Sequence, residues 1–365
     1  MTHGKIAFSL VLVAALVPGA PSRAAAPASP FKVLKKVDGM ASRIVMTGAK
    51  SGFAFFVDHE AGRPVAYRWN GKAWRPSPLP SGFRGGDNPE VEAAASGPDN
   101  VWALRSTVVK STKGDGPARS ELARWNGRRW TKNRAFPGVL LDQIAVLGRK
   151  NVWVFGTDIR AKKDKAWHYN GRTWRARTAT GWSSDHLTVR SGAGRIWAID
   201  SFGGRELLRW TGTRWKTVEI ALPGGAARWE TTSLDVQGER VTVAFSTKRW
   251  AEDGIPLDGE SRIVSGDGRR WRVEKPGPAQ SKVLNMAIPD GRGGMWTLGS
   301  APSGPDEVDR LYRRTAKGRW KTRVLPYGNL NLQPHELVRL PGSTRLIGVA
   351  GTYLVHEYGR IITTR

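Results

Sequence analysis

Carboxylates and histidines stand at the start of several short apolar runs, and they are the residues of this chain best suited to chemistry. If those runs are neighbouring strands, their first residues converge on one side of the fold. Carboxylate oxygens and imidazole nitrogens from several strands could then hold a divalent cation or a polar ligand. The competing explanation is that the first residues of strands are polar because they meet solvent. The candidates are Asp142, Asp185, His186, Glu230, His335 and Glu336.

Lysines and arginines form a second candidate group, in two connections between predicted strands. These connections, residues 105–121 and 157–165, vary in length, and variable loops on a rigid scaffold are where binding usually occurs. A cluster of positive charge there would attract an anionic polymer. The residues are Lys110, Lys113, Arg119, Arg160, Lys162, Lys163 and Lys165.

A repeated unit defines the elements that must position these residues. It consists of an aromatic residue, a glycine two residues later and a tryptophan, and the closing tryptophans are 41–56 residues apart. A repeat of this length is typical of stacked structural units. Because Asn-Gly between apolar residues favours a type I′ turn, each unit should join two strands by a two-residue turn. The copies span residues 69–74, 125–130, 169–174 and 210–215, with weaker copies at 268–271 and 318–320.

Apolar runs upstream of each hairpin indicate two further strands per unit. Runs such as 101–104 and 152–155 are typical of strands that are buried on both faces, and each follows another short run and a turn. Four short strands per repeat describe one blade of a β-propeller. We therefore expect an all-β, seven-bladed propeller of four-stranded antiparallel blades, with most of the 17 tryptophans packed between blades. The blades are expected at about 41–80, 88–137, 140–180, 184–223, 229–276, 282–326 and 334–365.

Closure of the ring has two candidate strands. Residues 31–37, in an N-terminal segment that spans 27–40, alternate between polar and apolar as an outermost strand does. Pairing of this segment with the last blade would remove an open sheet edge. Residues 359–365 compete for the same place, so the sequence leaves the closing strand open.

Parts of the chain resemble kelch-type repeats, the propeller units found in galactose oxidase. Residues 67–80, 122–137 and 207–223 are similar to the second half of that repeat, with an aromatic residue, a turn, a tryptophan and a final proline. The kelch Gly-Gly doublet is missing, and single glycines, Gly156, Gly299 and Gly351, stand in its place. Residues 265–271 also resemble an Asp-box hairpin that is one residue short. The resemblance implies a propeller over residues 41–365.

The first 26 residues read as a signal peptide. An apolar run at 6–17 is too short to span a bilayer, and three alanines at 24–26 offer a cleavage site. We therefore expect a protein secreted to a bacterial cell envelope or medium, and we expect it to be a monomer. The formal net charge of +27 favours polyanionic partners, although an arginine-rich composition that only decorates solvated strands would give the same number.

The sequence favours a binding protein over an enzyme. It has no Gly-x-Ser-x-Gly elbow, no His-Glu-x-x-His and no phosphate loop, and the absence of cysteine excludes thiolate catalysis and disulfides. We expect a secreted, non-enzymatic propeller that binds an anionic cell-wall polymer, a carbohydrate or a protein through its loop-bearing face. No cofactor is expected except a possible divalent cation in the central channel. The alternative is a metal-dependent lyase or glycan-active hydrolase at the channel mouth, with His186, His335, Glu230 and Glu336 as acid–base candidates.

Overall fold

The computed structural model describes most of the chain from residue 29 to the C-terminus. The described residues are 29–58, 60–81, 83, 91–111, 114–178, 187–200, 207–220, 222, 229–247, 249–250, 256–257, 260–274, 277, 283–301, 308–325, 332–352 and 358–365. The expected signal peptide therefore lies outside the described residues. No helix long and apolar enough to cross a membrane occurs within them.

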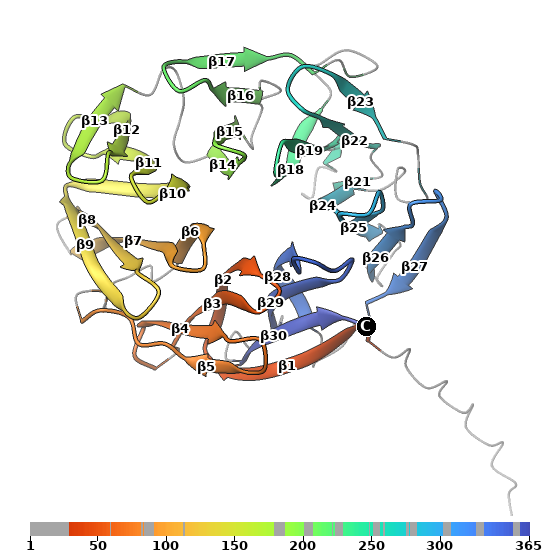
Figure 1. Cartoon of the computed structure of the whole chain (residues 1–365), viewed down its shortest axis with the longest axis horizontal. Coiled ribbons are helices and arrows are strands. Elements are labelled where there is room, and N and C mark those ends of the chain that lie inside the picture. Colours follow the sequence, from red (N-terminus) through yellow and green to blue (C-terminus); the bar gives the residue numbers. More distant parts are fainter. Residues whose placement is uncertain are drawn as a thin grey trace, which may run out of the picture.

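Seven four-stranded antiparallel sheets stand around a central channel, so the expected seven-bladed propeller is confirmed (Figure 1). In each blade the first strand lines the channel and the fourth forms the outer rim. Blade 1 contains β2 (Met40–Gly48), β3 (Ser51–Val57), β4 (Pro64–Trp69) and β5 (Trp74–Pro76). Blade 2 contains β6 (Val91–Gly97), β7 (Asn100–Ser111), β8 (Gly114–Trp125) and β9 (Trp130–Pro137). Blade 3 contains β10 (Val139–Gly148), β11 (Asn151–Asp158), β12 (Lys163–Tyr169) and β13 (Trp174–Thr178).

The remaining blades repeat this order. Blade 4 contains β14 (Leu187–Gly192), β15 (Arg195–Asp200), β16 (Leu207–Trp210) and β17 (Trp215–Val218). Blade 5 contains β18 (Glu230–Gln237), β19 (Arg240–Ser246), β22 (Ser261–Gly266) and β23 (Trp271–Val273), with the short ribbon β20 (Arg249–Trp250) and β21 (Pro256–Leu257) between its second and third strands. Blade 6 contains β24 (Val283–Pro289), β25 (Met295–Ala301), β26 (Val308–Arg314) and β27 (Trp320–Val324).

Blade 7 is built from both ends of the chain. Its first three strands are β28 (Leu332–Arg339), β29 (Leu346–Thr352) and β30 (Tyr358–Thr364), and its fourth is β1 (Phe31–Asp38). β1 pairs antiparallel with β30, so the two candidate segments occupy neighbouring positions rather than one position. Phe31 and Val37 of β1 are buried, which anchors the N-terminal strand to the last blade.

Because strand direction alternates within a blade, two of its turns lie on one face of the ring and its other connections lie on the opposite face. We call the first the turn face, which carries the turns between strands one and two and between strands three and four. The opposite side is the loop face. The first residue of each inner strand, such as Val91 or Leu187, lies at the loop face.

The Trp-Asn-Gly hairpins join the third and fourth strands as expected, but the prediction of a type I′ turn is wrong. Trp69 pairs with Trp74, so the loop has four residues, and a positive φ occurs at Gly71 (90°) but not at Asn70. Instead, Asn70 Oδ1 accepts hydrogen bonds from the backbone N–H groups of Lys72 (3.0 Å) and Ala73 (2.9 Å). The asparagine side chain therefore stabilises the turn by capping free N–H groups.

The aromatic residues of the hairpins pack between blades, as the sequence predicts. Phe53 of blade 1 meets Trp125 and Trp130 of blade 2, with ring centroids 5.2 Å and 5.1 Å apart and the rings edge to face. Arginines of the third strands cover further indoles: the Arg124 guanidinium lies 5.5 Å from the Trp102 ring centre, and Arg313 lies 5.0 Å from that of Trp296. Part of the arginine content thus belongs to the blade packing itself.

Candidate functional site

The inner strands of five blades share a β-bulge near their loop-face end. Their pairing with the second strand shifts by one residue at 41/43, 141/143, 231/233, 284/286 and 334/336. A bulge leaves one residue unpaired and turns the following side chains to a new direction. The residues that follow the five bulges are Arg43, Gln143, Ser233, Met286 and Glu336.

Three residues that follow a bulge accept a hydrogen bond from the backbone of the next blade. Glu336 Oε2 accepts the N–H of Ile44 (2.7 Å), Gln143 Oε1 accepts that of Val189 (3.1 Å), and Ser233 Oγ accepts that of Ala287 (3.0 Å). An inner strand has a free edge toward the channel, and its N–H groups need partners. Polar residues of the channel therefore act first as links between blades.

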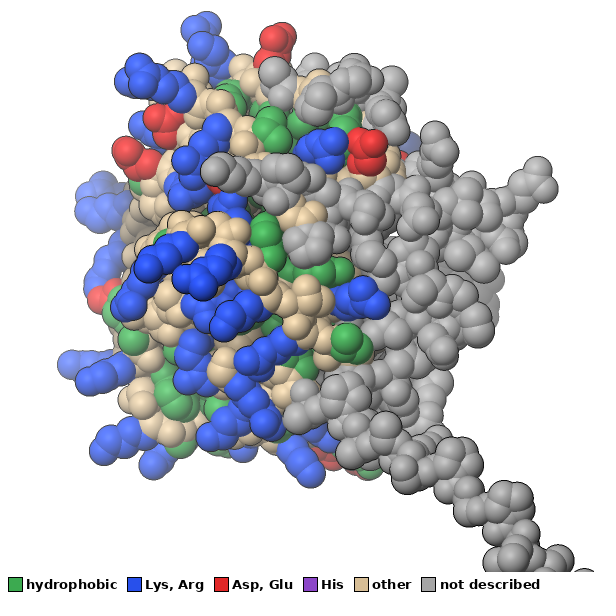
Figure 2. Space-filling view, turned by 90° about the vertical axis from the view of Figure 1, so that its right-hand side faces the viewer, with side chains coloured by type: hydrophobic (Ala, Val, Ile, Leu, Met, Phe, Trp, Pro, Cys, Tyr) green, Lys and Arg blue, Asp and Glu red, His purple; other side chains and the backbone are tan. Residues whose placement is uncertain are grey.

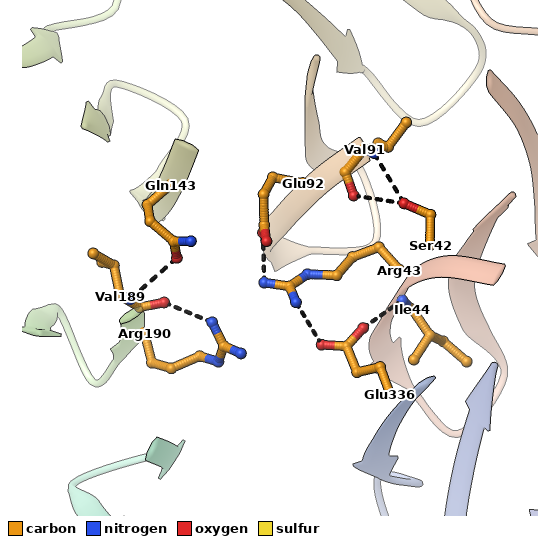
Figure 3. A network of polar contacts seen from close by, with 9 residues as sticks. All are labelled: Ser42, Arg43, Ile44, Val91, Glu92, Gln143, Val189, Arg190 and Glu336. Carbon is orange, nitrogen blue, oxygen red and sulfur yellow. Dashed lines mark hydrogen bonds and ion pairs between the residues drawn. The ribbon is translucent and has the colours of Figure 1, made fainter. Parts of the chain in front are cut away.

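Arg43 is the centre of a charged cluster in the channel (Figure 3). Its guanidinium forms ion pairs with Glu92 of blade 2 and with Glu336 of blade 7, the latter at 3.1 Å. Burial raises the pKa of Glu92, Arg43 and Arg190 oppose that rise, and Glu336 adds to it. One guanidinium thus holds three neighbouring blades together through two carboxylates.

Arg190 lies across the channel from this cluster, and its contacts differ from those of Arg43. Its Nη1 donates to the carbonyl of its neighbour Val189 (2.9 Å), and it forms no ion pair with any described residue (Figure 3). Burial lowers the pKa of the Arg190 guanidinium, and the charge of Arg43 lowers it further. A guanidinium offers five N–H donors, so most of those on Arg190 remain available.

Asp235, on the inner strand of the next blade, is a second ionisable group close to Arg190. Burial raises the pKa of Asp235 to about 6, against hydrogen bonding by Gln237 and the charges of Arg190 and Arg339. Among the described residues, neither Asp235 Oδ2 nor Arg339 Nε has a hydrogen-bond partner. These groups differ from the Arg43 cluster because their hydrogen-bonding capacity is unfilled.

A cavity of about 300 Å³ joins the two groups. It is lined by the inner strands of blades 1–5 and 7, and its wall includes Met46, Ser191, Gln237 and Pro341. These residues lie in the last part of their strands or in the turn that follows, so the cavity lies toward the turn face. Its size suits a ligand about as large as one sugar ring.

The predicted ring of carboxylates and histidines forms only in part. Glu336 lines the cavity, and His335 and Asp142 occupy equivalent bulges in blades 7 and 3. Glu230 opens β18, while Asp185 and His186 lie outside the described residues. Among the residues that the structure describes, no three His, Asp or Glu side chains come together in a way that could hold a metal ion.

The arginines of the channel were not among the site residues predicted from the sequence. Arg43, Arg190 and Arg339 line the cavity together with Asp235, yet each stands in the middle or at the end of an inner strand rather than at its start. An ionisable residue inside an otherwise apolar strand is the signal that could have identified them.

The predicted basic loops are only partly free. Lys165 forms an ion pair with Asp158 (2.7 Å), and Arg119 forms one with Glu121 (3.0 Å). Lys162 and Lys163 are exposed on the loop face, as is Arg160. Lys113 lies outside the described residues, as does the side chain of Lys110, a residue of β7.

A larger group of basic residues lies on the turn face, in the six turns that join third to fourth strands. These turns contain nine lysines and arginines against one carboxylate, Asp267, whose pKa is lowered by the backbone N–H groups of Arg270 and Arg269. All nine side chains are exposed, and none forms an ion pair with a described residue. We call them the turn-face cations: Lys72, Arg128, Arg129, Arg172, Arg214, Arg269, Arg270, Lys317 and Arg319.

The turn-face cations lie on the outer rim, because they join the two outer strands of each blade. A side view shows lysine and arginine side chains spread over the wall and one face of the ring, with few carboxylates among them (Figure 2). The turns between first and second strands, which lie nearer the channel, carry both positive and negative side chains. In these turns Asp99 pairs with Arg149, and Glu239 lies 4.0 Å from Arg195. The excess positive charge therefore follows the rim.

Comparison with known proteins supports the fold and leaves the function open. The sequence matches no protein-family model and no curated protein. Solved structures that are similar include YCF48 bound to a D1 peptide (TM-score 0.55, 12% identity, 95% of this chain and 99% of that one) and an ulvan lyase of a polysaccharide lyase family (0.52, 10%, 90% and 95%). A third is the GH74 enzyme of Niastella koreensis (0.55, 12%), of which this chain covers 53%. At these identities the similarity shows a shared seven-bladed propeller fold.

Proposed function

We propose that this chain is a secreted, non-enzymatic propeller that binds an extended anionic polymer of the cell surface along the rim of its turn face. The observation that carries the proposal is that the six outer turns hold nine exposed cations, none paired with a described residue, against one carboxylate. Cations at regular intervals around a rigid ring suit a flexible polyanion, because each contact releases condensed counterions without any large rearrangement of the protein.

The turn face is favoured over the loop face by the number of free charges. Two of the seven basic residues predicted on the loop face are paired with carboxylates, at Asp158 and Glu121. Within the described part of the chain the turn-face cations have no such partners, so they keep their full attraction for an external anion.

The test compares matched variants on the two faces. Affinity for poly(glycerol phosphate) and for dextran sulfate is measured by fluorescence anisotropy between 50 and 400 mM NaCl, with neutral dextran as the control polymer. We expect affinity to fall steeply with salt, and the triple variant Arg128→Gln, Arg129→Gln, Arg172→Gln to lower the salt slope by about three. The matched loop-face variant Arg160→Gln, Lys162→Asn, Lys163→Gln should keep the native slope.

Two results would contradict this proposal. Binding that does not respond to salt would remove the electrostatic argument. Loss of binding in the loop-face variant but not in the turn-face variant would move the interface to the opposite side of the ring.

A lyase or glycan-active hydrolase at the channel mouth is the second candidate. His335 is the feature in its favour, because it is exposed on the bulge of β28 near the loop face. Glu336, however, is held by Arg43 and by the N–H of Ile44, so it is poorly placed to exchange protons with a substrate. Turnover of a uronate-containing polysaccharide that stops when chelator is added or when His335→Ala is introduced would support this candidate.

A further inference from the structure

The channel cavity contains hydrogen-bonding groups that the protein itself does not satisfy. Arg190 uses one donor on a neighbouring carbonyl, and Arg339 Nε and Asp235 Oδ2 have no partner among the described residues. Buried polar atoms without a partner are costly, and in native proteins they usually contact water or a ligand. Arg43, by contrast, is occupied by two carboxylates.

We propose that this cavity is a binding site for a small hydroxylated carboxylic acid, such as a sugar acid, whose carboxylate contacts Arg190 and Arg339 and whose hydroxyl donates to Asp235. A planar guanidinium matches a carboxylate with two parallel hydrogen bonds. The unfilled oxygen of Asp235 needs a donor, which a carboxylate alone cannot supply.

The local charge favours a monoanion. At pH 7.5, where Asp235 is ionised, Arg190, Arg339 and Asp235 together carry one net positive charge, which a single carboxylate neutralises. A phosphate or sulfate dianion would leave an excess negative charge beside Asp235 and Glu336. The cavity of about 300 Å³ lies among the inner strands, whereas the turn-face cations lie on the outer rim, so this site is separate from the rim that binds polyanions in the proposed function.

The rest of the cavity also fits a sugar acid. Ser191 and Gln237 add polar groups to one side, and Gln237 is fixed by a hydrogen bond from its Nε2 to Pro289 O (2.9 Å). Val45 and Val338 supply apolar wall that can pack against a ring face. A few convergent polar groups on an otherwise apolar wall are typical of small-ligand sites.

Binding should depend on pH through Asp235. The groups that face it are Arg190 from β14, Arg339 from β28 and Gln237 on its own strand, with Arg43 and Glu336 on the far wall. A bound carboxylate repels the ionised form of Asp235, so affinity should rise as pH falls from 7.5 toward 5 and Asp235 gains a proton. A sugar acid remains ionised over this range.

Isothermal titration calorimetry with D-glucuronate and D-gluconate tests the proposal. The neutral control is methyl glucoside, and the anion controls are inorganic phosphate and sulfate. We expect one glucuronate or gluconate per chain, tighter binding at pH 5.5 than at pH 7.5, and about tenfold or greater loss of affinity in Arg190→Gln. Asp235→Asn should bind at both pH values with nearly the same affinity, because its side chain does not titrate.

Matched variants keep the test decisive. Arg339→Gln serves if Arg190→Gln does not fold, and it should also weaken binding. Arg160→Gln and the turn-face triple variant should bind the acids as the native chain does, which separates this site from the polyanion interface. The proposal is overturned if neither acid binds, if phosphate or sulfate binds as tightly at pH 7.5, or if the cavity variants leave the affinity of the acids unchanged.

Discussion

Glu274 shows how single charged residues join the blades. It follows β23 in blade 5 and accepts hydrogen bonds from Arg240 (2.8 Å), Arg272 (3.3 Å) and, across the blade boundary, Arg314 (2.9 Å). Burial raises the pKa of Glu274, but the hydrogen bond from Arg314, the hydrogen bond from Ser265 and the arginine charges outweigh that rise and lower the pKa. The positive charges of several arginines in this basic chain are thus partly neutralised by a carboxylate inside the structure.

Glu274→Gln should therefore destabilise the protein in a pH-dependent way. Because the pKa is lower in the folded chain, the stabilisation is complete above the unfolded value of about 4.5 and is lost as pH falls through the folded value. We expect a cost of about 3 kcal/mol in urea unfolding at pH 7 and a smaller difference from the native chain at pH 3.5. The exposed Glu239→Gln is the control and should change stability little at either pH. An equal cost at both pH values would show that charge is not the cause.

At the scale of strands, sequence patterns predicted the blades well and the channel poorly. Each hairpin is formed by residues that are close in the sequence, so the local pattern at Trp125, Asn126 and Trp130 is enough to predict a turn between paired strands. The channel depends on which residues bulge, and the residues that follow the bulges at Asp142 and His335 bond to neighbouring blades that are distant in the sequence. The sequence therefore predicted a ring of first residues, of which Asp185 and His186 lie outside the described residues, and it did not predict the hydrogen bonds that link the inner strands of adjacent blades.

Those links predict specific effects on the inner strands. Ser233→Ala removes the acceptor for the N–H of Ala287, and we expect a cost of about 1–2 kcal/mol with faster hydrogen exchange at that amide. Gln143→Ala should do the same for Val189, and the two costs should add because the sites lie in different blades. Ser233→Thr keeps the hydroxyl and is the matched control. Unchanged exchange at Ala287 in Ser233→Ala would mean that the link carries no energy.

At the scale of the whole molecule, stability depends on closing the ring. β1 comes from the start of the chain and completes the blade formed by its end, so one strand connects the first and last blades. Phe31 is 2% exposed and belongs to a buried cluster that includes Leu298 of blade 6 and Leu346 and Ile362 of blade 7. An open propeller would leave the edge of β30 unpaired and several apolar residues in water.

Phe31→Ala should therefore weaken the whole ring rather than one strand. Truncating a buried phenylalanine costs about 3–5 kcal/mol, and because the cluster that contains Phe31 spans blades 6 and 7, we expect the loss in a single cooperative unfolding transition. Lys32→Ala, at an exposed position of the same strand, is the control and should unfold as the native chain does. A chain that begins at Gly39 should regain thermal stability when a peptide of residues 29–38 is added, since the peptide can pair with β30 in the same register. If that chain is as stable without the peptide, another contact must hold blade 7 to blade 1, and β1 is not what closes the ring.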